Sequence, residues 1–207
     1  MNNQRVIGIC GLIGSGKDTV GDELLDKHGY IRFSFAMVLK DMCAVLFDWD
    51  RNMLEGKTPE TRALREIPDE WWSTKLGREW SPRIALQYIG TDIMRNHFHE
   101  DIWLNTVENR IRKHNKVVFT DCRFPNEIEF IKDIGELWVV ERGERPAWYD
   151  HASNYNTASL ERRQLMDSPT DLGVHESEWA WVGIEPDQFL TNNETLENLY
   201  TKIRNLA

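Results

Sequence analysis

Nine residues near the start of the chain have the spacing of a loop that binds phosphate groups. Residues 11–19 read GLIGSGKDT, and Gly11, Gly16 and Lys17 give the pattern G-x-x-x-x-G-K. Glycines let backbone N–H groups approach phosphate oxygens without obstruction by a Cβ atom, and the lysine adds a positive charge near the β- and γ-phosphates. The segment therefore predicts binding of a nucleoside triphosphate, with Lys17 also catalytic. The residues predicted to contact the triphosphate are Gly11, Gly14, Ser15, Gly16, Lys17, Asp18 and Thr19.

The residue after the lysine departs from the usual pattern, and the departure bears on the metal ion. Ser or Thr normally follows the lysine and coordinates Mg²⁺ through its hydroxyl. Here Asp18 follows, and Thr19 comes next. Mg²⁺ favours oxygen ligands and keeps several waters, so either side chain can serve it. The sequence leaves Asp18 and Thr19 as alternative Mg²⁺ ligands.

Apolar runs alternate with segments of helical spacing along most of the chain. Strands are expected at residues 5–10, 30–33, 117–120, 137–140 and 189–191. Helices are expected at residues 16–28, 36–47, 81–96, 101–114, 125–133 and 196–206, and Ser81-Pro82 is a start signal for the third of them. This alternation predicts an α/β fold with three layers, a mostly parallel sheet and right-handed crossovers.

Two longer polar segments interrupt the alternation. Residues 48–81 hold four of the nine tryptophans and are expected to form an excursion with short helical pieces. Packing of these rings against each other is favoured over stacking on a nucleotide base. Residues 142–180 are expected to form a mobile lid. We expect residues 1–207 to make one domain that includes both segments.

The predicted carboxyl ends of the strands bring further chemistry to the same edge of the sheet. Ligands of such sheets bind there, so residues 11–19, Ser34, Asp121–Arg123 and Asn192 are expected on one rim. Asp121 can hold Mg²⁺ or its water shell, and Arg123 can contact a transferred or accepting phosphate. The alternative is that Asp121 only caps the helix that starts near residue 125.

A second set of polar side chains is suited to a phosphorylated acceptor. Arg83 and Gln87 are four residues apart and share one helix face, where an arginine can grip a monophosphate and a glutamine a base edge. An ordinary solvated face is the alternative. Ser34 can face the acceptor or cap a helix, and the lid arginines can stabilise the transferred phosphoryl group or be merely solvated. The further candidates are Lys40, Thr91, Asp92, Arg142, Arg145, His175 and Glu178.

Composition limits the class of ligand. The chain has 207 residues and a formal net charge of −9, which argues against a nucleic acid polymer as the main partner because the phosphate backbone needs a basic face. Cys10, Cys43 and Cys122 have no metal-binding spacing and are expected to be reduced thiols. The first strand begins close to Met1, so we expect no signal peptide, and no apolar run approaches the ~20 residues that span a bilayer.

The motifs together resemble the deoxynucleoside monophosphate kinases of tailed bacteriophages. The matching segments are GLIGSGKDT, SPRIALQYIGTD followed by DIWL, VVFTDCRFPNE, WVVERGERP, HESE and DQFLTNNETLENLYTKI. The resemblance implies a P-loop kinase fold that transfers the ATP γ-phosphoryl group to a deoxynucleoside monophosphate with Mg²⁺, in a host-like cytoplasm. It also implies that a homodimer is plausible.

The resemblance implies roles for particular residues as well. Arg83 and Gln87 would hold the acceptor phosphate and base, Asp121 and Arg123 would lie at the acceptor, and Asn192 would lie near the ATP base. The resemblance covers most of the chain outside residues 48–80, for which we identify no matching segment, so the preferred base stays open. Two alternatives remain: a related small-molecule kinase of the dephospho-coenzyme A kinase type, and a P-loop ATPase or switch that acts on a protein partner.

Overall fold

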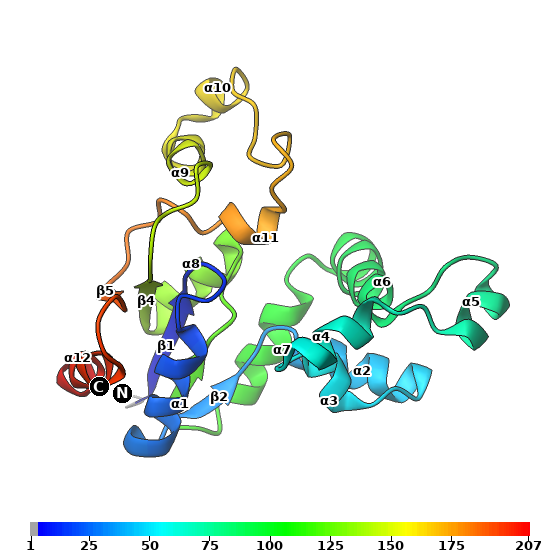
Figure 1. Cartoon of the computed structure of the whole chain (residues 1–207), viewed down its shortest axis with the longest axis horizontal. Coiled ribbons are helices and arrows are strands. Elements are labelled where there is room, and N and C mark those ends of the chain that lie inside the picture. Colours follow the sequence, from blue (N-terminus) through cyan, green and yellow to red (C-terminus); the bar gives the residue numbers. More distant parts are fainter. Residues whose placement is uncertain (1–3) are drawn as a thin grey trace. The chain divides into compact units, whose positions relative to one another are not determined.

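The computed structural model describes residues 4–207, so part of the segment behind the signal-peptide expectation lies outside the described residues (Figure 1). The described chain divides into two compact units. One, here called the sheet unit, comprises the described residues up to Ser34 together with Ile111–Ala207. The other, here called the helical unit, is Phe35–Arg110. The prediction that residues 1–207 form a single kinase domain stays a prediction.

The sheet unit contains a five-stranded sheet in which every pair of neighbours is parallel. Its strands follow the spatial order β2-β3-β1-β4-β5. The order puts β1 at the centre, so the loop that leaves it emerges in the middle of the carboxyl edge. The five predicted strands and the parallel sheet are confirmed. Their bounds are β1 Arg5–Cys10, β2 Ile31–Phe33, β3 Lys116–Phe119, β4 Glu136–Glu141 and β5 Gln188–Thr191.

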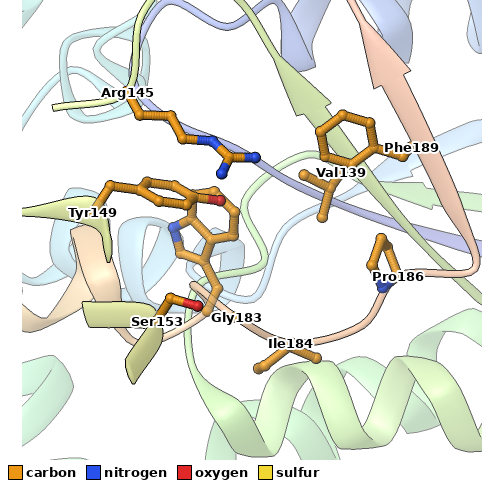
Figure 2. A pocket seen from close by; sticks show the side chains of 9 residues that line it. Val139, Arg145, Tyr149, Ser153, Gly183, Ile184, Pro186 and Phe189 are labelled. Atoms are coloured by element: carbon orange, nitrogen blue, oxygen red, sulfur yellow. The ribbon is translucent and has the colours of Figure 1, made fainter. Parts of the chain in front are cut away.

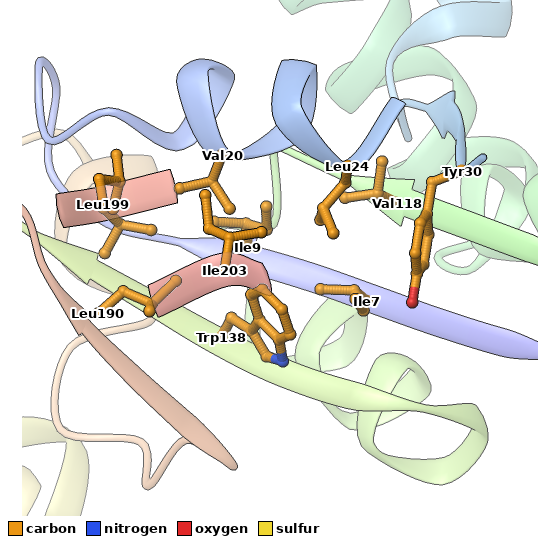
Figure 3. Packing of buried hydrophobic residues seen from close by; sticks show 11 residues of the cluster. Ile7, Ile9, Val20, Leu24, Tyr30, Val118, Trp138, Leu190, Leu199 and Ile203 are labelled. Carbon is orange, nitrogen blue, oxygen red and sulfur yellow. The ribbon is translucent and has the colours of Figure 1, made fainter. Parts of the chain in front are cut away.

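Helices cover both faces of this sheet. On one face, α1 (Lys17–His28) and α12 (Leu196–Leu206) bury apolar side chains such as Leu24 and Ile203 against Trp138 (Figure 3). On the other face, α8 (Pro125–Ile134) packs so closely that a Cβ atom at Gly8 would lie 2.8 Å from Ile131. The three layers expected from the alternating pattern are therefore present.

The segment predicted as a lid contains more structure than its polar composition suggests. It holds three helices between β4 and β5: α9 Tyr149–Thr157, α10 Leu160–Arg163 and α11 Glu176–Trp179. Tyr149 and Trp179 are buried, and the Asn156 amide donates hydrogen bonds to the carbonyl oxygens of Trp179 and Val182 at 2.9 and 2.8 Å. This amide joins α9 to the chain that returns from α11.

The helical unit is a set of short helices around an aromatic core. The helices are α2 Met37–Phe47, α3 Arg51–Glu55, α4 Pro59–Glu66, α5 Glu70–Leu76, α6 Pro82–Gln87, η1 Tyr88–Phe98 and α7 Ile102–Ile111, which leads back to the sheet unit. Trp80 is buried, and Trp49 and Trp72 contact the ring of Phe47. The prediction of packing is confirmed for these three tryptophans, whereas Trp71 is exposed and contacts the ring of Trp72. The short helical pieces are confirmed as well.

One predicted helix has a different form in the structure. It starts as expected, with the Ser81 hydroxyl accepting from the Ile84 N–H and proline at the first helical position. From Tyr88 it continues as a wider π-helix instead of an α-helix. Gly90 lies against Leu39, and its carbonyl accepts a 3.0 Å hydrogen bond from the indole of Trp103. A side chain of α7 thus donates to a carbonyl oxygen inside this helix, a contact that the spacing of residues 81–96 does not indicate.

The helix expected to run to residue 114 ends earlier, at Ile111. Among residues 4–207 no helix combines the length and apolarity needed to cross a bilayer.

Candidate active site

The predicted phosphate loop joins β1 to α1 at the carboxyl edge of the sheet. Three of its glycines have a positive φ: Gly11 (151°), Gly14 (79°) and Gly16 (104°). The Lys17 ammonium folds back over the loop and donates to the carbonyl oxygens of Gly11 and Leu12 at 2.7 and 2.8 Å. The loop is therefore already curled around a lysine charge at the start of a helix, which is the arrangement that binds phosphate.

Burial and a neighbouring cation affect this lysine. Burial of the side chain, and then the positive charge of Arg123, lower the pKa of Lys17, while Asp18 and Glu178 oppose the shift. The positive charges of Lys17 and Arg123 therefore repel each other. A bound polyphosphate would relieve that repulsion, because it places negative charge beside both groups.

Asn192 reaches the phosphate loop from the end of β5. Its amide nitrogen donates to the Ser15 carbonyl oxygen at 2.8 Å, and a Cβ atom at Gly16 would lie 2.4 Å from the same nitrogen. The side-chain amide of Asn192 thus contacts the loop backbone, and its backbone N–H donates to the Glu141 carbonyl oxygen at 2.8 Å. The resemblance put it near the ATP base, and that role stays a prediction.

Asp121 follows β3, where the sequence predicted it. The Ser34 hydroxyl, at the end of β2, donates to Asp121 Oδ2 at 2.6 Å. At the start of α8 the N–H groups of Arg123 and Phe124 donate to Glu127 Oε2. Helix capping by Asp121 stays an alternative. Ala36 is the residue that precedes α2, and helix capping by Ser34 stays an alternative.

Arg123 connects this edge of the sheet to the predicted lid. Its Nη1 lies 3.1 Å from Glu178 Oε1 and 3.4 Å from the Ser177 hydroxyl, both in α11. His175 stands at the start of α11, where Nδ1 accepts from the Ser177 N–H at 3.2 Å. Arg123 is thus brought into one cluster with His175 and Glu178, which were predicted from a different segment of the sequence.

The two lid arginines have different surroundings. Arg142 is exposed, next to Gly143, whose N–H donates to Asn193 Oδ1 at 2.7 Å and so ties the end of β4 to the loop after β5. Arg145 pairs with Glu141 and lies 4.6 Å from the ring centre of Tyr149. Figure 2 shows its guanidinium at a pocket of about 180 Å³ that Tyr149 and Phe189 also line. These contacts occupy Arg145 with neighbours outside the phosphate loop.

The remaining candidates lie in the helical unit. Arg83 and Gln87 are exposed on α6, as their spacing predicted, and Arg83 Nη1 lies 3.9 Å from Glu66 Oε1. Thr91 and Asp92 are exposed on η1. Lys40 is held by Glu55, with 2.9 Å between Nζ and Oε1. The Arg83–Glu66 pair is long and exposed, so it leaves Arg83 able to exchange its partner for a phosphate.

Glu55 has an unusually acidic carboxyl group. Burial by itself would raise its pKa, but hydrogen bonds from Arg51 and Lys40 outweigh that effect and lower the pKa to about 2. Lys40 therefore has a structural partner in the helical unit, which was not expected from the sequence.

Sequence reasoning passed over two residues that contact the phosphate loop's helix. Thr120 Oγ1 donates to Asp18 Oδ1 at 3.2 Å, and Arg32 Nη2 donates to the Asp18 carbonyl oxygen at 3.0 Å. Their positions at the carboxyl ends of β3 and β2 were the available signal, because that edge of a parallel sheet gathers ligand-binding groups.

A parallel sheet of this order, with a glycine-rich loop and lysine after its central strand, defines the chain as a P-loop phosphotransferase of the α/β class. A model of the deoxynucleotide monophosphate kinase family matches residues 51–154. The match includes residues 51–80, so the expectation that the tryptophan-rich segment lies outside the family resemblance was wrong. The chain belongs to the deoxynucleotide monophosphate kinase family, as the phage-kinase resemblance predicted.

Viral relatives support the assignment over most of the chain. A protein of Acanthamoeba polyphaga mimivirus that carries the deoxynucleotide monophosphate kinase name is 30% identical over 213 residues, covering 96% of this chain and 93% of the relative. The deoxynucleoside-5′-monophosphate kinase of Escherichia phage T5 is 44% identical over 192 residues, covering 64% of this chain and 73% of the relative. Among solved structures, dephospho-CoA kinase from Campylobacter jejuni is 14% identical with a TM-score of 0.48, covering 100% of this chain and 96% of that chain.

Proposed function

We propose that this enzyme transfers the γ-phosphoryl group of ATP, in the presence of Mg²⁺, to a deoxynucleoside monophosphate, giving ADP and a deoxynucleoside diphosphate. The observation that carries the proposal is the convergence of the Lys17 loop, Asp121 and Arg123 on one edge of the sheet, in a chain of this family. Its viral relatives and its three free, buried thiols support action in the cytoplasm of a host cell.

The residues present fit a magnesium nucleotide. Ser15 Oγ is buried and has no hydrogen-bond partner within the described residues, so a phosphate oxygen would satisfy it. Asp18 and Thr19 offer oxygen donors in the first turn of α1, and Mg²⁺ needs only one or two such protein ligands beside phosphates and water. When bound, Mg²⁺ would neutralise charge on the β- and γ-phosphates.

The chain's own residues supply positioning and charge, because phosphoryl transfer needs no nucleophilic side chain. Lys17 stabilises negative charge on the transferred group from the loop side, and Arg123 does so from the end of β3. Arg123 is at present paired with Glu178, which is one-quarter exposed, so an acceptor phosphate would take the place of a carboxylate that is also negatively charged. Arg142 is the lid arginine best placed to join them, since Arg145 is paired with Glu141.

Acceptor recognition is assigned to the helical unit. Arg83 would bind the monophosphate bidentately, and Gln87, one turn later on α6, would donate to and accept from the base edge. Thr91 and Asp92, exposed on η1, are the further candidates for contact with the deoxynucleoside.

The test is a coupled assay of ADP release with ATP, Mg²⁺ and each of dAMP, dGMP, dCMP and dTMP in turn. Release that depends on one or more of the monophosphates supports the proposal and gives the base preference. A reaction without monophosphate measures ATP hydrolysis, and Lys17→Ala measures contamination by other kinases.

Two results would contradict the proposal. ADP release that is the same with and without every monophosphate would favour an ATPase or switch. ADP release with dephospho-coenzyme A and none with the four monophosphates would favour the small-molecule kinase.

A further inference from the structure

Asp18 is tied to the sheet by side chains from two different strands. The Thr120 hydroxyl, directly after β3, donates to Asp18 Oδ1 at 3.2 Å. Arg32, in β2, donates from Nη2 to the Asp18 carbonyl oxygen at 3.0 Å, and its Nη1 lies 4.0 Å from Asp18 Oδ1. Both contacts reach the first turn of α1, where the phosphate loop ends.

The approach of Arg32 depends on a glycine one turn further along the helix. A Cβ atom at Gly21 would lie 2.3 Å from Arg32 Nη2 and 2.5 Å from Thr120 Cγ2. Because Gly21 has no side chain, the Arg32 guanidinium and the Thr120 methyl group can lie directly against α1. Arg32 Nη2 also donates to Asp22 Oδ1 at 3.0 Å, so one guanidinium holds two successive turns of the helix.

Without the contacts from Thr120 and Arg32, the Asp18 carboxylate would be free to rotate. The Asp18 side chain is 80% exposed, whereas that of Arg32 is 22% exposed. An exposed carboxylate samples several rotamers, and ordering it for a metal ion costs free energy. A hydrogen bond that already fixes one oxygen removes part of that cost and leaves the other oxygen for the metal or one of its waters.

We propose that Thr120 is a positioning residue which, with Arg32, holds the Asp18 carboxylate in the orientation that receives the Mg²⁺ of the bound nucleotide. The inference rests on the proposed function, because it requires that a magnesium nucleotide binds in the phosphate loop. It also explains why a longer acidic side chain can stand where Ser or Thr is usual: the sheet supplies a donor that fixes it.

The experiment measures metal binding directly, without turnover. Free Mn²⁺ is followed by electron paramagnetic resonance as it is titrated into the enzyme with ADP, because Mn²⁺ takes the oxygen ligands that suit Mg²⁺. Thr120→Val has nearly the same shape and lacks only the donor. We expect it to weaken Mn²⁺ binding about 2- to 10-fold, the range of one hydrogen bond, and we expect Thr120→Ser to retain the wild-type affinity.

A second set of variants, made in a protein that carries Asp18→Ser, separates a positioning role of Thr120 from a general effect of Thr120 on the fold. Asp18→Ser restores the usual hydroxyl and removes the carboxylate that Thr120 contacts. In that background Thr120→Val should leave Mn²⁺ binding unchanged, whereas a purely structural threonine would weaken it equally in both. Thermal unfolding of each variant checks that the fold is intact.

The outcomes are distinct. Equal losses in the two backgrounds, or an unchanged affinity for a folded Thr120→Val, would overturn the positioning role and leave the kinase proposal in place. A wild-type enzyme that binds no Mn²⁺ with ADP would overturn both.

Discussion

Replacing Gly16 by alanine tests the link between the phosphate loop and the end of β5. Gly16 has φ 104°, a conformation that strains any residue with a side chain. The added Cβ would also lie 2.4 Å from the amide nitrogen of Asn192, which must then move and lose its hydrogen bond to the Ser15 carbonyl. Two separate costs therefore act at one position.

Each cost can be given a magnitude. Holding a non-glycine residue in a sparsely populated backbone region costs about 1–3 kcal/mol. Loss of the Asn192–Ser15 hydrogen bond costs about 0.5–1.5 kcal/mol. We expect Gly16→Ala to lose about 1.5–4.5 kcal/mol, shared between the free energy of unfolding and the free energy of ADP binding, and Asn192→Ala to lose only the hydrogen-bond part.

The assay is a double-mutant cycle over Gly16→Ala, Asn192→Ala and the combination of the two. Urea unfolding gives the stability of each variant, and calorimetric titration gives its affinity for ADP. Because both single variants lose the same hydrogen bond, the double variant should lose less than the sum of the two, by about 0.5–1.5 kcal/mol.

Additive losses, equal to the sum within about 0.5 kcal/mol, would refute the reasoning, since they would mean that the amide and the glycine act independently. A cost below about 1 kcal/mol for Gly16→Ala would refute it as well, because neither the strain nor the contact would then be present.

Three further predictions concern other charged groups. Lys17→Ala should abolish most turnover while far-UV circular dichroism stays unchanged, because the ammonium faces the ligand; normal turnover would contradict the phosphate-loop assignment. Arg83→Ala should raise the KM for the monophosphate by the equivalent of about 1.5–3 kcal/mol, the worth of a charged hydrogen bond, and leave the KM for ATP unchanged. Glu55→Gln should destabilise the fold at pH 7 by about 3 kcal/mol at most, because the partners of Glu55, Arg51 and Lys40, lower its pKa to about 2. That contribution is present above pH about 4.5 and is lost as the pH falls towards 2, so urea unfolding should show the difference from wild type vanishing in acid.

The phosphate loop and the strands were predictable because their signals are local. Gly11, Gly16 and Lys17 lie within seven positions, and each strand of a fully covered parallel sheet is a short apolar run. The rim residues followed from topology: once β1 and β3 were expected to be parallel, Asp121 had to end near the loop that follows Cys10.

Contacts between distant segments account for the structural features that could not be predicted from the sequence. The spacing of residues 81–96 does not indicate that the Trp103 indole donates a hydrogen bond to the Gly90 carbonyl, or that the helix is a π-helix from Tyr88 onwards. The short β2 exposes Ile31 and turns Arg32 towards α1, so the pattern of that strand hides its contact with Asp18. When the partner of a side chain lies on another helix or strand, tertiary packing determines the contact, and the periodicity of the sequence does not encode it.

The predicted lid shows the same limit at a larger scale. Its polar composition masks apolar side chains that are buried in the structure, among them Tyr149, Ala152, Trp179 and Ala180. The sequence suggests that Arg145 is an unpaired lid arginine. In the structure it forms an ion pair with Glu141 and lies over the ring of Tyr149. Among the predicted arginines this leaves Arg123 and Arg83 with the contacts most easily exchanged for phosphate.

The insertion of the helical unit between β2 and β3 has a consequence for the order of folding. These two strands are neighbours in the sheet, with Phe33 opposite Phe119, although the whole of Phe35–Arg110 separates them in the chain. Pairing them closes a very long loop, whereas the inserted residues form their contacts within one continuous stretch. We therefore expect the inserted helices to form early and the β2–β3 ladder late, so that the edge carrying Ser34, Thr120 and Asp121 is among the last parts of the molecule to be completed.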